Sequence, residues 1–189
     1  MQVHTDVPAL LSRAIPVAQR VVDGIRPEQL AAPTPCPEWN VRALLNHLIV
    51  LHRMAAAAAT GDAMPGWSDD LLGDDPPSAF AAAARDAGAA LASPGALDRA
   101  YPLPWGETPG ESVGRMLLAD TVIHAWDLAK ATGQPTALDP DLCEEVLAWG
   151  RSVMRPEYRT PAAGFGPEVA VPAGTPPCAR LAAFYGRQP

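Results

Sequence analysis

The sequence predicts an all-α fold: an up-and-down bundle of four helices, followed by an extra C-terminal helix and a Pro-rich tail. Apolar residues recur at helical spacing in several long segments, and connections rich in Pro and Gly separate these segments. Alternating β-branched residues are scarce, so no strand is predicted. The 189 residues, 48% of them hydrophobic, suit one domain over 1–189 with a sizeable core.

The first helix is predicted over about Val7 to Gly24, where Pro16 either kinks or breaks it. A connection with three prolines follows. The second helix is predicted from its N-cap Asn40 to Gly61, a typical C-terminal glycine. Its apolar stripe makes this segment the clearest helix of the chain.

Three further helices have recognisable ends. They are predicted behind a cap at Ser78, from Glu111 or Ser112 to Gly133, and from about Pro140 to Met154 behind Asp139. From Arg155 onward the Pro-rich chain is expected to wrap over the bundle, with one short helix in ARLAAFYGR. The loops between the helices are longer than a minimal bundle needs, which favours a role for them in function.

Charge and hydropathy exclude several classes of partner. The formal net charge is −7 and the pI is about 5.0, which argues against a sequence-independent nucleic-acid binder. No basic run suggests an anionic membrane partner, and no stretch is long and apolar enough for a membrane span. The N-terminus lacks the features of a secretory signal, so a cytoplasmic location is expected.

The three cysteines, Cys36, Cys143 and Cys178, are widely spaced and include no CxxC pair. The sequence therefore suggests neither a zinc ribbon nor a disulfide framework. Cys36 is either a reactive thiol or a small buried hydrophobic residue, and the second interpretation is the commoner one. No GxGxxG, P-loop, GxSxG or HExxH motif occurs, which removes the dinucleotide, nucleotide, α/β-hydrolase and zinc-protease classes.

Asp120 and His124 carry the first functional signal. They lie four residues apart on the predicted fourth helix, so both side chains leave the same face. Because that face is otherwise apolar, a buried carboxylate there needs compensation, which a divalent cation would provide. An internal Asp–His hydrogen bond with a purely structural role is the alternative.

His47 strengthens the metal hypothesis, because it likewise interrupts the apolar stripe of the second helix. Two imidazoles and a carboxylate suit zinc, nickel or iron(II), and three protein ligands leave a coordination position open. His52 projects about 140° away from His47 and is expected at the surface or in a groove. His4 lies in the N-terminal stretch and carries little weight.

The five tryptophans have different expected roles. Trp39 could form the first half of a hydrophobic staple before the second helix, and Trp126 and Trp149 are expected in the core. Trp67 and Trp105 lie in predicted loops. They either pack those loops down, the favoured role, or line a pocket.

Several segments together resemble a known family. PEQLAAPTPCPEWNVRALLNHL, LADTVIHAWDLAKATGQ and the closing FGPEVAVP and RLAAFYGR resemble the DinB-like metal-binding superfamily. The closest resemblance is to the actinobacterial branch around the N-terminal domain of mycothiol-dependent maleylpyruvate isomerase. It implies a four-helix bundle whose metal is held by a His of the second helix, matching His47. The other ligands, an acidic residue and a His four later, match Asp120 and His124.

The resemblance also implies a reaction. Members related to thiol transferases bind a low-molecular-weight thiol, in actinobacteria mycothiol, at the open position of the metal. We therefore expect a zinc-dependent thiol transferase or isomerase-like enzyme that joins such a thiol to a small electrophile. Related bundles often pair, so a homodimer is possible. A non-catalytic divalent-metal protein and a purely structural bundle remain alternatives.

Two departures from the isomerases narrow this expectation. The isomerases carry a glutamate where this chain has Asp120, and the shorter carboxylate could change the metal. They also have a further C-terminal domain, for which this chain is too short. Maleylpyruvate isomerisation itself is therefore not expected here.

Overall fold

The computed structural model describes residues 6–160 and 164–189. Within these ranges the chain forms six α-helices, two short 3₁₀ turns and one two-stranded antiparallel sheet. In chain order the helices and strands are α1 (Val7–Asp23), α2 (Val41–Thr60), α3 (Pro76–Leu91), β1 (Ala100–Leu103), β2 (Gly106–Pro109), α4 (Gly110–Thr132), α5 (Pro140–Val153) and α6 (Pro177–Phe184). The 3₁₀ turns cover Pro27–Gln29 and Pro156–Tyr158.

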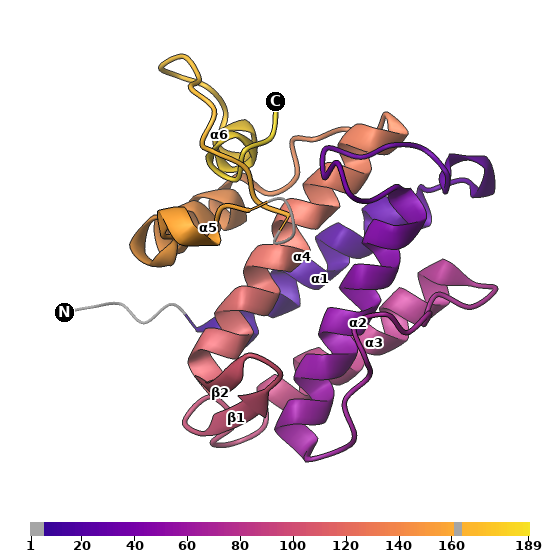
Figure 1. Cartoon of the computed structure of the whole chain (residues 1–189), viewed down its shortest axis with the longest axis vertical. Helices are drawn as coiled ribbons and strands as arrows, with labels where there is room; N and C mark the ends of the chain where they lie inside the picture. Colours follow the sequence, from indigo (N-terminus) through magenta and orange to yellow (C-terminus); the bar gives the residue numbers. More distant parts are fainter. Residues whose placement is uncertain (1–5, 161–163) are drawn as a thin grey trace.

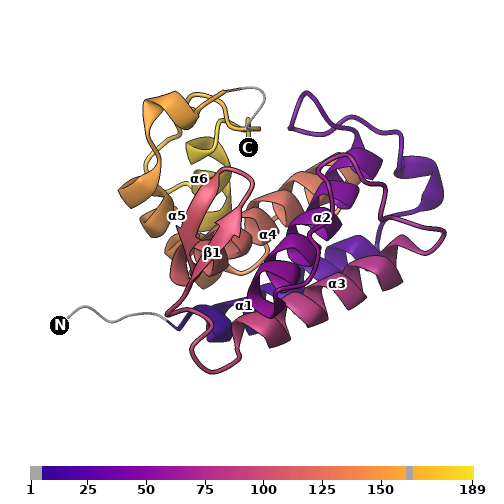
Figure 2. The ribbon, with the colours of Figure 1, turned by 60° about the horizontal axis from the view of Figure 1, so that its bottom comes forward.

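The longest helix, α4, lies at the centre of the arrangement. Helices α1 and α2 each pack against both α3 and α4, while α5 and α6 pack against each other and against α4. The α5–α6 pair lies across α4 from α2 and α3 (Figure 1; Figure 2). The prediction of a mostly helical protein is confirmed. No helix in the described ranges is both long enough and apolar enough to cross a membrane.

The predicted helix ends agree closely with the structure. The Asn40 side chain accepts a hydrogen bond from the backbone N–H of Ala43, 2.9 Å away, and so caps α2. Gly61 ends α2 and Gly133 ends α4 with positive φ angles of 82° and 71°, a conformation that favours glycine. Asp139 caps α5 as expected.

The start of the third helix was predicted wrongly. Its N-cap is Asp75, and the helix begins at Pro76, two residues before the predicted cap Ser78. The Asp75 carboxylate accepts hydrogen bonds from both the backbone and the hydroxyl of Ser78. Pro suits the first turn of a helix because its missing N–H has no intrahelical partner there. Helix α1 runs through Pro16 as one helix.

The β1–β2 hairpin was not predicted either, and it makes the all-α description incomplete. Tyr101 pairs with Thr108 in its short antiparallel ladder. The phenol of Tyr101 is buried and donates a 2.6 Å hydrogen bond to the carbonyl of Ala96, which ties the hairpin to the chain before it. The turn between the strands carries Trp105, which is 53% exposed.

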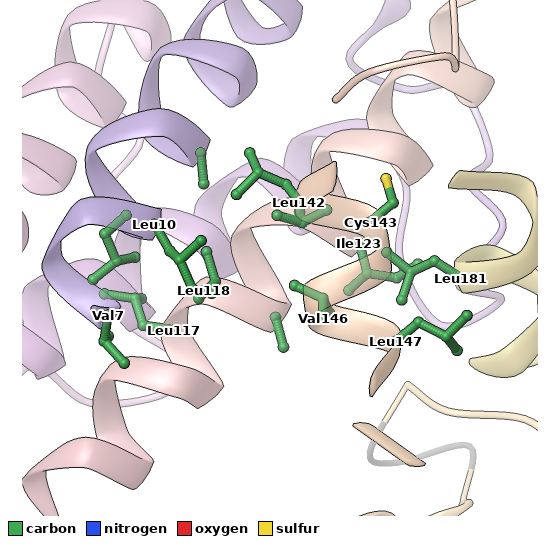
Figure 3. Close-up of a cluster of buried hydrophobic side chains, with 14 of the residues drawn as sticks. Val7, Leu10, Leu117, Leu118, Ile123, Leu142, Cys143, Val146, Leu147 and Leu181 are labelled. Atoms are coloured by element: carbon green, nitrogen blue, oxygen red, sulfur yellow. The ribbon is translucent and has the colours of Figure 1, made fainter. Parts of the chain in front are cut away.

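The core divides into two clusters of buried apolar side chains. One joins α1 and α4 to α5 and α6, and Figure 3 shows its leucines and valines meeting across these helices. The other joins α2 and α3 to α1 and α4, around the fully buried ring of Phe80. Small residues in the core let neighbouring helices approach each other closely. At Gly114 of α4, an added Cβ would lie only 2.6 Å from Cγ1 of Val7 on α1.

A disulfide between Cys143 of α5 and Cys178 of α6 corrects the expectation from the cysteine spacing. The two residues are 35 positions apart, and their Cα atoms lie 5.1 Å from each other. An ion pair between Arg180 and Glu144 joins the same two helices. The α5–α6 unit therefore carries both covalent and ionic connections.

Candidate functional site

The three residues predicted as metal ligands come from the packed pair α2 and α4. The imidazole rings of His47 and His124 meet edge to face, with centroids 5.3 Å apart and an interplanar angle of 84°. One turn earlier on α4, Oδ1 of Asp120 lies 3.8 Å from Nε2 of His124. His124 is 2% exposed, whereas His47 is partly buried and 22% of the Asp120 side chain is exposed.

Asp127, which the sequence analysis did not single out, fixes the orientation of His124. Its Oδ2 lies 3.0 Å from Nδ1 of His124 on the same helix. An ionised carboxylate only accepts hydrogen bonds, so Nδ1 carries the proton and donates it to Asp127. In the neutral imidazole the lone pair is then on Nε2, the nitrogen on the Asp120 side.

A buried network holds Asp127 in turn. The guanidinium of Arg187 donates from Nε to Oδ1 and from Nη2 to Oδ2, at 3.0 and 2.8 Å. Its Nη2 also donates to the sulfur of Cys36 at 2.9 Å, and that thiol donates to Oδ2 of Asp127 at 3.3 Å. Asp127 is 0%, Cys36 1% and Arg187 3% exposed, so the whole network lies in the interior.

The surroundings of Asp120, Asp127 and His47 shift the pKa values of these side chains. Burial raises the pKa of Asp120, and His124 and Arg187 counteract this only in part. Burial also opposes ionisation of Asp127, but hydrogen bonds from His124 and Arg187 outweigh it and lower the pKa of that carboxyl. Burial, with a smaller contribution from His124, lowers the pKa of His47 to about 3, so this imidazole is neutral near neutral pH.

A second group of three possible metal ligands, called the compact trio here, has its ligand atoms closer together. Among the residues that the structure describes, only Cys36, His124 and Asp127 offer three potential ligand atoms that all lie within 4.8 Å of one another. The ligand atoms of His47, Asp120 and His124, called the wider trio here, do not all meet this distance criterion. This buried Cys/His/Asp group could bind a metal, but its hydrogen bonds are already satisfied internally, and the cationic Arg187 donates hydrogen bonds to two of its members, Cys36 and Asp127.

The network keeps the thiol of Cys36 protonated. Burial and the nearby Asp127 raise the pKa of this thiol, which donates its proton to Oδ2 of Asp127. Cys36 is buried, as the favoured interpretation held, but it is part of a polar network and not only an apolar filler.

The wider trio has donor chemistry that suits a divalent cation. His47 is neutral, and within the described residues its ring makes aromatic contacts but no hydrogen bond. Two imidazoles that share a zinc ion have ring centroids about 5 Å apart, if each Zn–N bond is about 2.1 Å and the geometry is tetrahedral. The 5.3 Å between His47 and His124 agrees with that value. Asp120 supplies a carboxylate whose burial a cation would compensate.

Tryptophans surround His47. The ring of Trp39 lies 4.4 Å from its ring, and Trp67 stacks on it at 6.0 Å with an interplanar angle of 17°. Trp105 of the hairpin turn contacts Trp67 at 5.9 Å. Trp67 and Trp105 are 48% and 53% exposed, so these rings, which pack the two loops together, also form a surface beside His47.

His52 lies elsewhere, and its predicted surface position was wrong. It is 0% exposed, and its Nδ1 lies 2.8 Å from the carbonyl of Leu48. Its ring meets Phe80 of α3, and its Nε2 lies 3.3 Å from the hydroxyl of Thr121 on α4. Helices α3 and α4 cover two sides of α2. The side chain of His52, which points away from His47, therefore lies in the interior and not in solvent. His4 is outside the described residues.

Comparisons with known proteins identify the family of the chain. Residues 11–129 match the model of the family described as "Mycothiol maleylpyruvate isomerase N-terminal domain". Two uncharacterized proteins of Mycobacterium tuberculosis, from strains CDC 1551 / Oshkosh and ATCC 25618 / H37Rv, are each 39% identical to the chain over 164 residues. That alignment covers 86% of this chain and 87% of each relative. No solved structure is significantly similar to the chain.

Proposed function

Because the chain belongs to the mycothiol maleylpyruvate isomerase N-terminal domain family, a DinB-like branch, we propose that it is a metal-dependent thiol transferase. In this proposal His47, Asp120 and His124 hold one divalent cation, with zinc as the first candidate and nickel or iron(II) as alternatives. The thiol is a low-molecular-weight compound such as mycothiol, and the acceptor is a small electrophile. Helices α1 to α4 would then correspond to the four-helix bundle of DinB-like proteins.

The observation that carries the proposal is the pair of contacts on the two nitrogens of His124. Asp127 holds Nδ1, which leaves the lone pair of Nε2 beside Asp120, with His47 edge to face against the same ring. A histidine that binds a metal commonly donates its other N–H to a carboxylate in this way. For all three ligands to reach one ion, the side chains would have to draw closer together, because their ligand atoms do not all lie within 4.8 Å of one another.

The chemistry needs no nucleophile from the protein. A divalent cation in this site supplies Lewis acidity that lowers the pKa of a coordinated thiol and so raises the thiolate fraction near neutral pH. In the proposed substitution, the thiol sulfur donates an electron pair to the electrophilic carbon and forms an S–C bond. The bond from that carbon to the leaving group breaks, the leaving group departs with its electron pair, and the thiol proton passes to solvent.

Residues around the site have distinct parts in this proposal. The protonated Cys36 stays within its network and does not attack the substrate. Trp67 and Trp105 offer an exposed apolar surface beside His47, on which a small electrophile could pack.

Two measurements on the purified protein test the proposal. Elemental analysis should find about one zinc, nickel or iron per chain, and His124→Gln should lose it. Incubation with mycothiol and monobromobimane should form the thioether faster than the uncatalysed reaction, with glutathione as the comparison thiol. Cys36→Ala is the matched control, because it should keep both the metal and the activity if the wider trio is the site.

The outcomes separate the candidate functions. Metal without thioether formation would support a non-catalytic metal-binding protein and contradict the transferase. Absence of metal would contradict both and leave a structural role for these side chains. Loss of metal in Cys36→Ala, with retention in His47→Gln, would move the site to the compact trio.

A further inference from the structure

Arg187 reaches the candidate site from a distant part of the chain. It follows α6, 60 positions after Asp127, and lies outside residues 11–129 that match the family model. Its Nη1 donates to the carbonyls of Gly164 and Tyr185, at 2.6 and 2.7 Å, while Nε and Nη2 face Asp127. All three guanidinium nitrogens are therefore used even without Cys36, to which Nη2 donates a further hydrogen bond, so the side chain has little freedom to move.

The backbone before Arg187 is shaped for this contact. Gly186 has a φ of 88°, a left-handed conformation that favours glycine. An added Cβ at Gly186 would lie 2.5 Å from Cα of Gly166, so the two glycines let two stretches of the tail meet backbone to backbone. The turn directs the guanidinium into the interior beside α4.

The contact between Asp127 and Arg187 joins two buried charges in one fixed geometry. Asp127 and Arg187 are buried opposite charges that bond side by side through two parallel hydrogen bonds. A carboxylate held in this way cannot rotate freely, and one of its oxygens, Oδ2, is also the acceptor for Nδ1 of His124. The orientation of the histidine therefore depends on Arg187, a side chain that makes no hydrogen bond to it.

We propose that Asp127 and Arg187 are positioning residues for His124. Arg187 fixes the Asp127 carboxylate, and Asp127 keeps the proton of His124 on Nδ1, which presents Nε2 as the ligand atom. The part of this inference that concerns the metal rests on the function proposed above. The part that concerns the His124 tautomer does not, because it is a property of the metal-free protein.

The first experiment reads the tautomer directly, without metal. In ¹⁵N-labelled, EDTA-treated protein at neutral pH, the ring nitrogens of His124 should show the Nδ1–H form as the main species. Arg187→Met and Asp127→Asn should reduce its share, and Arg187→Lys should give an intermediate result, since an ammonium cannot make the paired hydrogen bonds of a guanidinium.

Arg159→Met is the matched control. Arg159 holds the same tail through hydrogen bonds to the carbonyls of Gly166 and Phe184 and lies over the Phe184 ring, but it makes no hydrogen bond or ion pair with Asp127 in the described residues. The His124 tautomer should be unchanged in this variant. If single variants at the buried pair do not fold, the double variant Asp127→Asn/Arg187→Met removes both charges together and can be read in their place.

The second experiment measures the dissociation constant of Zn²⁺ by competition with a chelator. Loss of an outer partner of a histidine ligand typically weakens binding 10- to 100-fold, and we expect a loss of that order for Arg187→Met and Asp127→Asn. Arg159→Met should stay within about twofold of the wild type, since its contacts lie outside the ligand set.

The results distinguish two kinds of failure. If the wild type binds no metal, the proposed function fails, while the tautomer measurement still decides the positioning role. If Arg187→Met and Asp127→Asn keep both the Nδ1–H form and the wild-type zinc affinity, the positioning role is overturned. Equal losses in Arg159→Met would also overturn it, because they would trace the effect to the tail in general.

Discussion

Nε2 of His124 lies 3.8 Å from Oδ1 of Asp120, one helical turn away on α4. This distance is too long for a hydrogen bond but suits two atoms that face a common third partner. The purely structural alternative, in which the two residues hydrogen-bond directly to each other, therefore has no support in their geometry. His124 makes its hydrogen bond on the opposite side of the ring, to Asp127.

Asp120 gives the first prediction. Asp120→Asn removes the anionic ligand, and we expect zinc affinity to fall more than about 100-fold, beyond the usual effect of losing an outer partner. Asp120→Glu keeps the charge and should retain binding, although the longer side chain could change which metal is preferred. Isothermal titration with Zn²⁺, Ni²⁺ and Co²⁺ measures both effects. Wild-type affinity in Asp120→Asn would remove this residue from the site.

His52 predicts a pH dependence of stability. Burial lowers its pKa to about 4 in the folded protein, from about 6.5 in the unfolded chain. Between these values the unfolded chain binds the extra proton, so the folded state loses stability as the pH falls from 6.5 toward 4. The loss attributable to this one group should be on the order of 3 kcal/mol.

Urea unfolding at a series of pH values, with EDTA present, checks this prediction. His52→Leu should flatten the pH dependence between 6.5 and 4, whatever its effect on stability at neutral pH. His47 has a lowered pKa as well and should leave some slope in the variant. An unchanged slope in His52→Leu would show that the imidazole is not held neutral in the interior.

The disulfide predicts a large effect of reduction. Closing a loop between residues 35 positions apart stabilises a protein by about 3 to 4 kcal/mol in the chain-entropy account. Cys143→Ser/Cys178→Ser should therefore lower the melting temperature by roughly 10 °C. Calorimetry with and without reductant measures this, and reductant should shift the wild type but not the double variant. Equal melting temperatures of the wild type and the double variant without reductant would mean that the disulfide adds nothing to stability.

Trp67 predicts an optical signal of metal binding. Its ring stacks on His47, so Co²⁺ bound by that histidine should quench its fluorescence. Trp67→Phe should lose a substantial part of the quenching seen in the wild type. Trp149→Phe, which removes a tryptophan of α5 packed against the other core cluster, is the control and should leave the quenching intact. If Trp149→Phe lost the quenching and Trp67→Phe kept it, the ion would lie away from His47.

Local sequence signals predicted most of the helices. Asn40, Gly61, Gly133 and Asp139 mark helix ends through their own backbone and side-chain chemistry, which depends little on the rest of the fold. The hairpin was missed because its strands are short, contain two prolines and bury only three of their eight residues. Pairing across so short a ladder leaves almost no pattern in the sequence.

The candidate site was predictable only in part. Helical spacing brought His47, Asp120 and His124 to attention, and the same criterion could have added Asp127, one turn beyond His124 on a buried face. Arg187 and the Cys143–Cys178 pair carried no such signal, because their partners depend on how the tail folds back across the helices. His52 was misplaced because helical geometry fixes the angle between two residues but not which sides of the helix are covered.

The buried Asp127–Arg187 pair has a consequence for the history of the family. Removing either member strands a charge in the interior, at a cost of about 3 to 5 kcal/mol, whereas replacing both with neutral residues can leave the stability of the fold nearly unchanged. Mutations at these two positions should therefore be inherited as compensating pairs. Among homologues, an acid at the first position should accompany a guanidinium at the second, and lineages that have lost one should have lost the other.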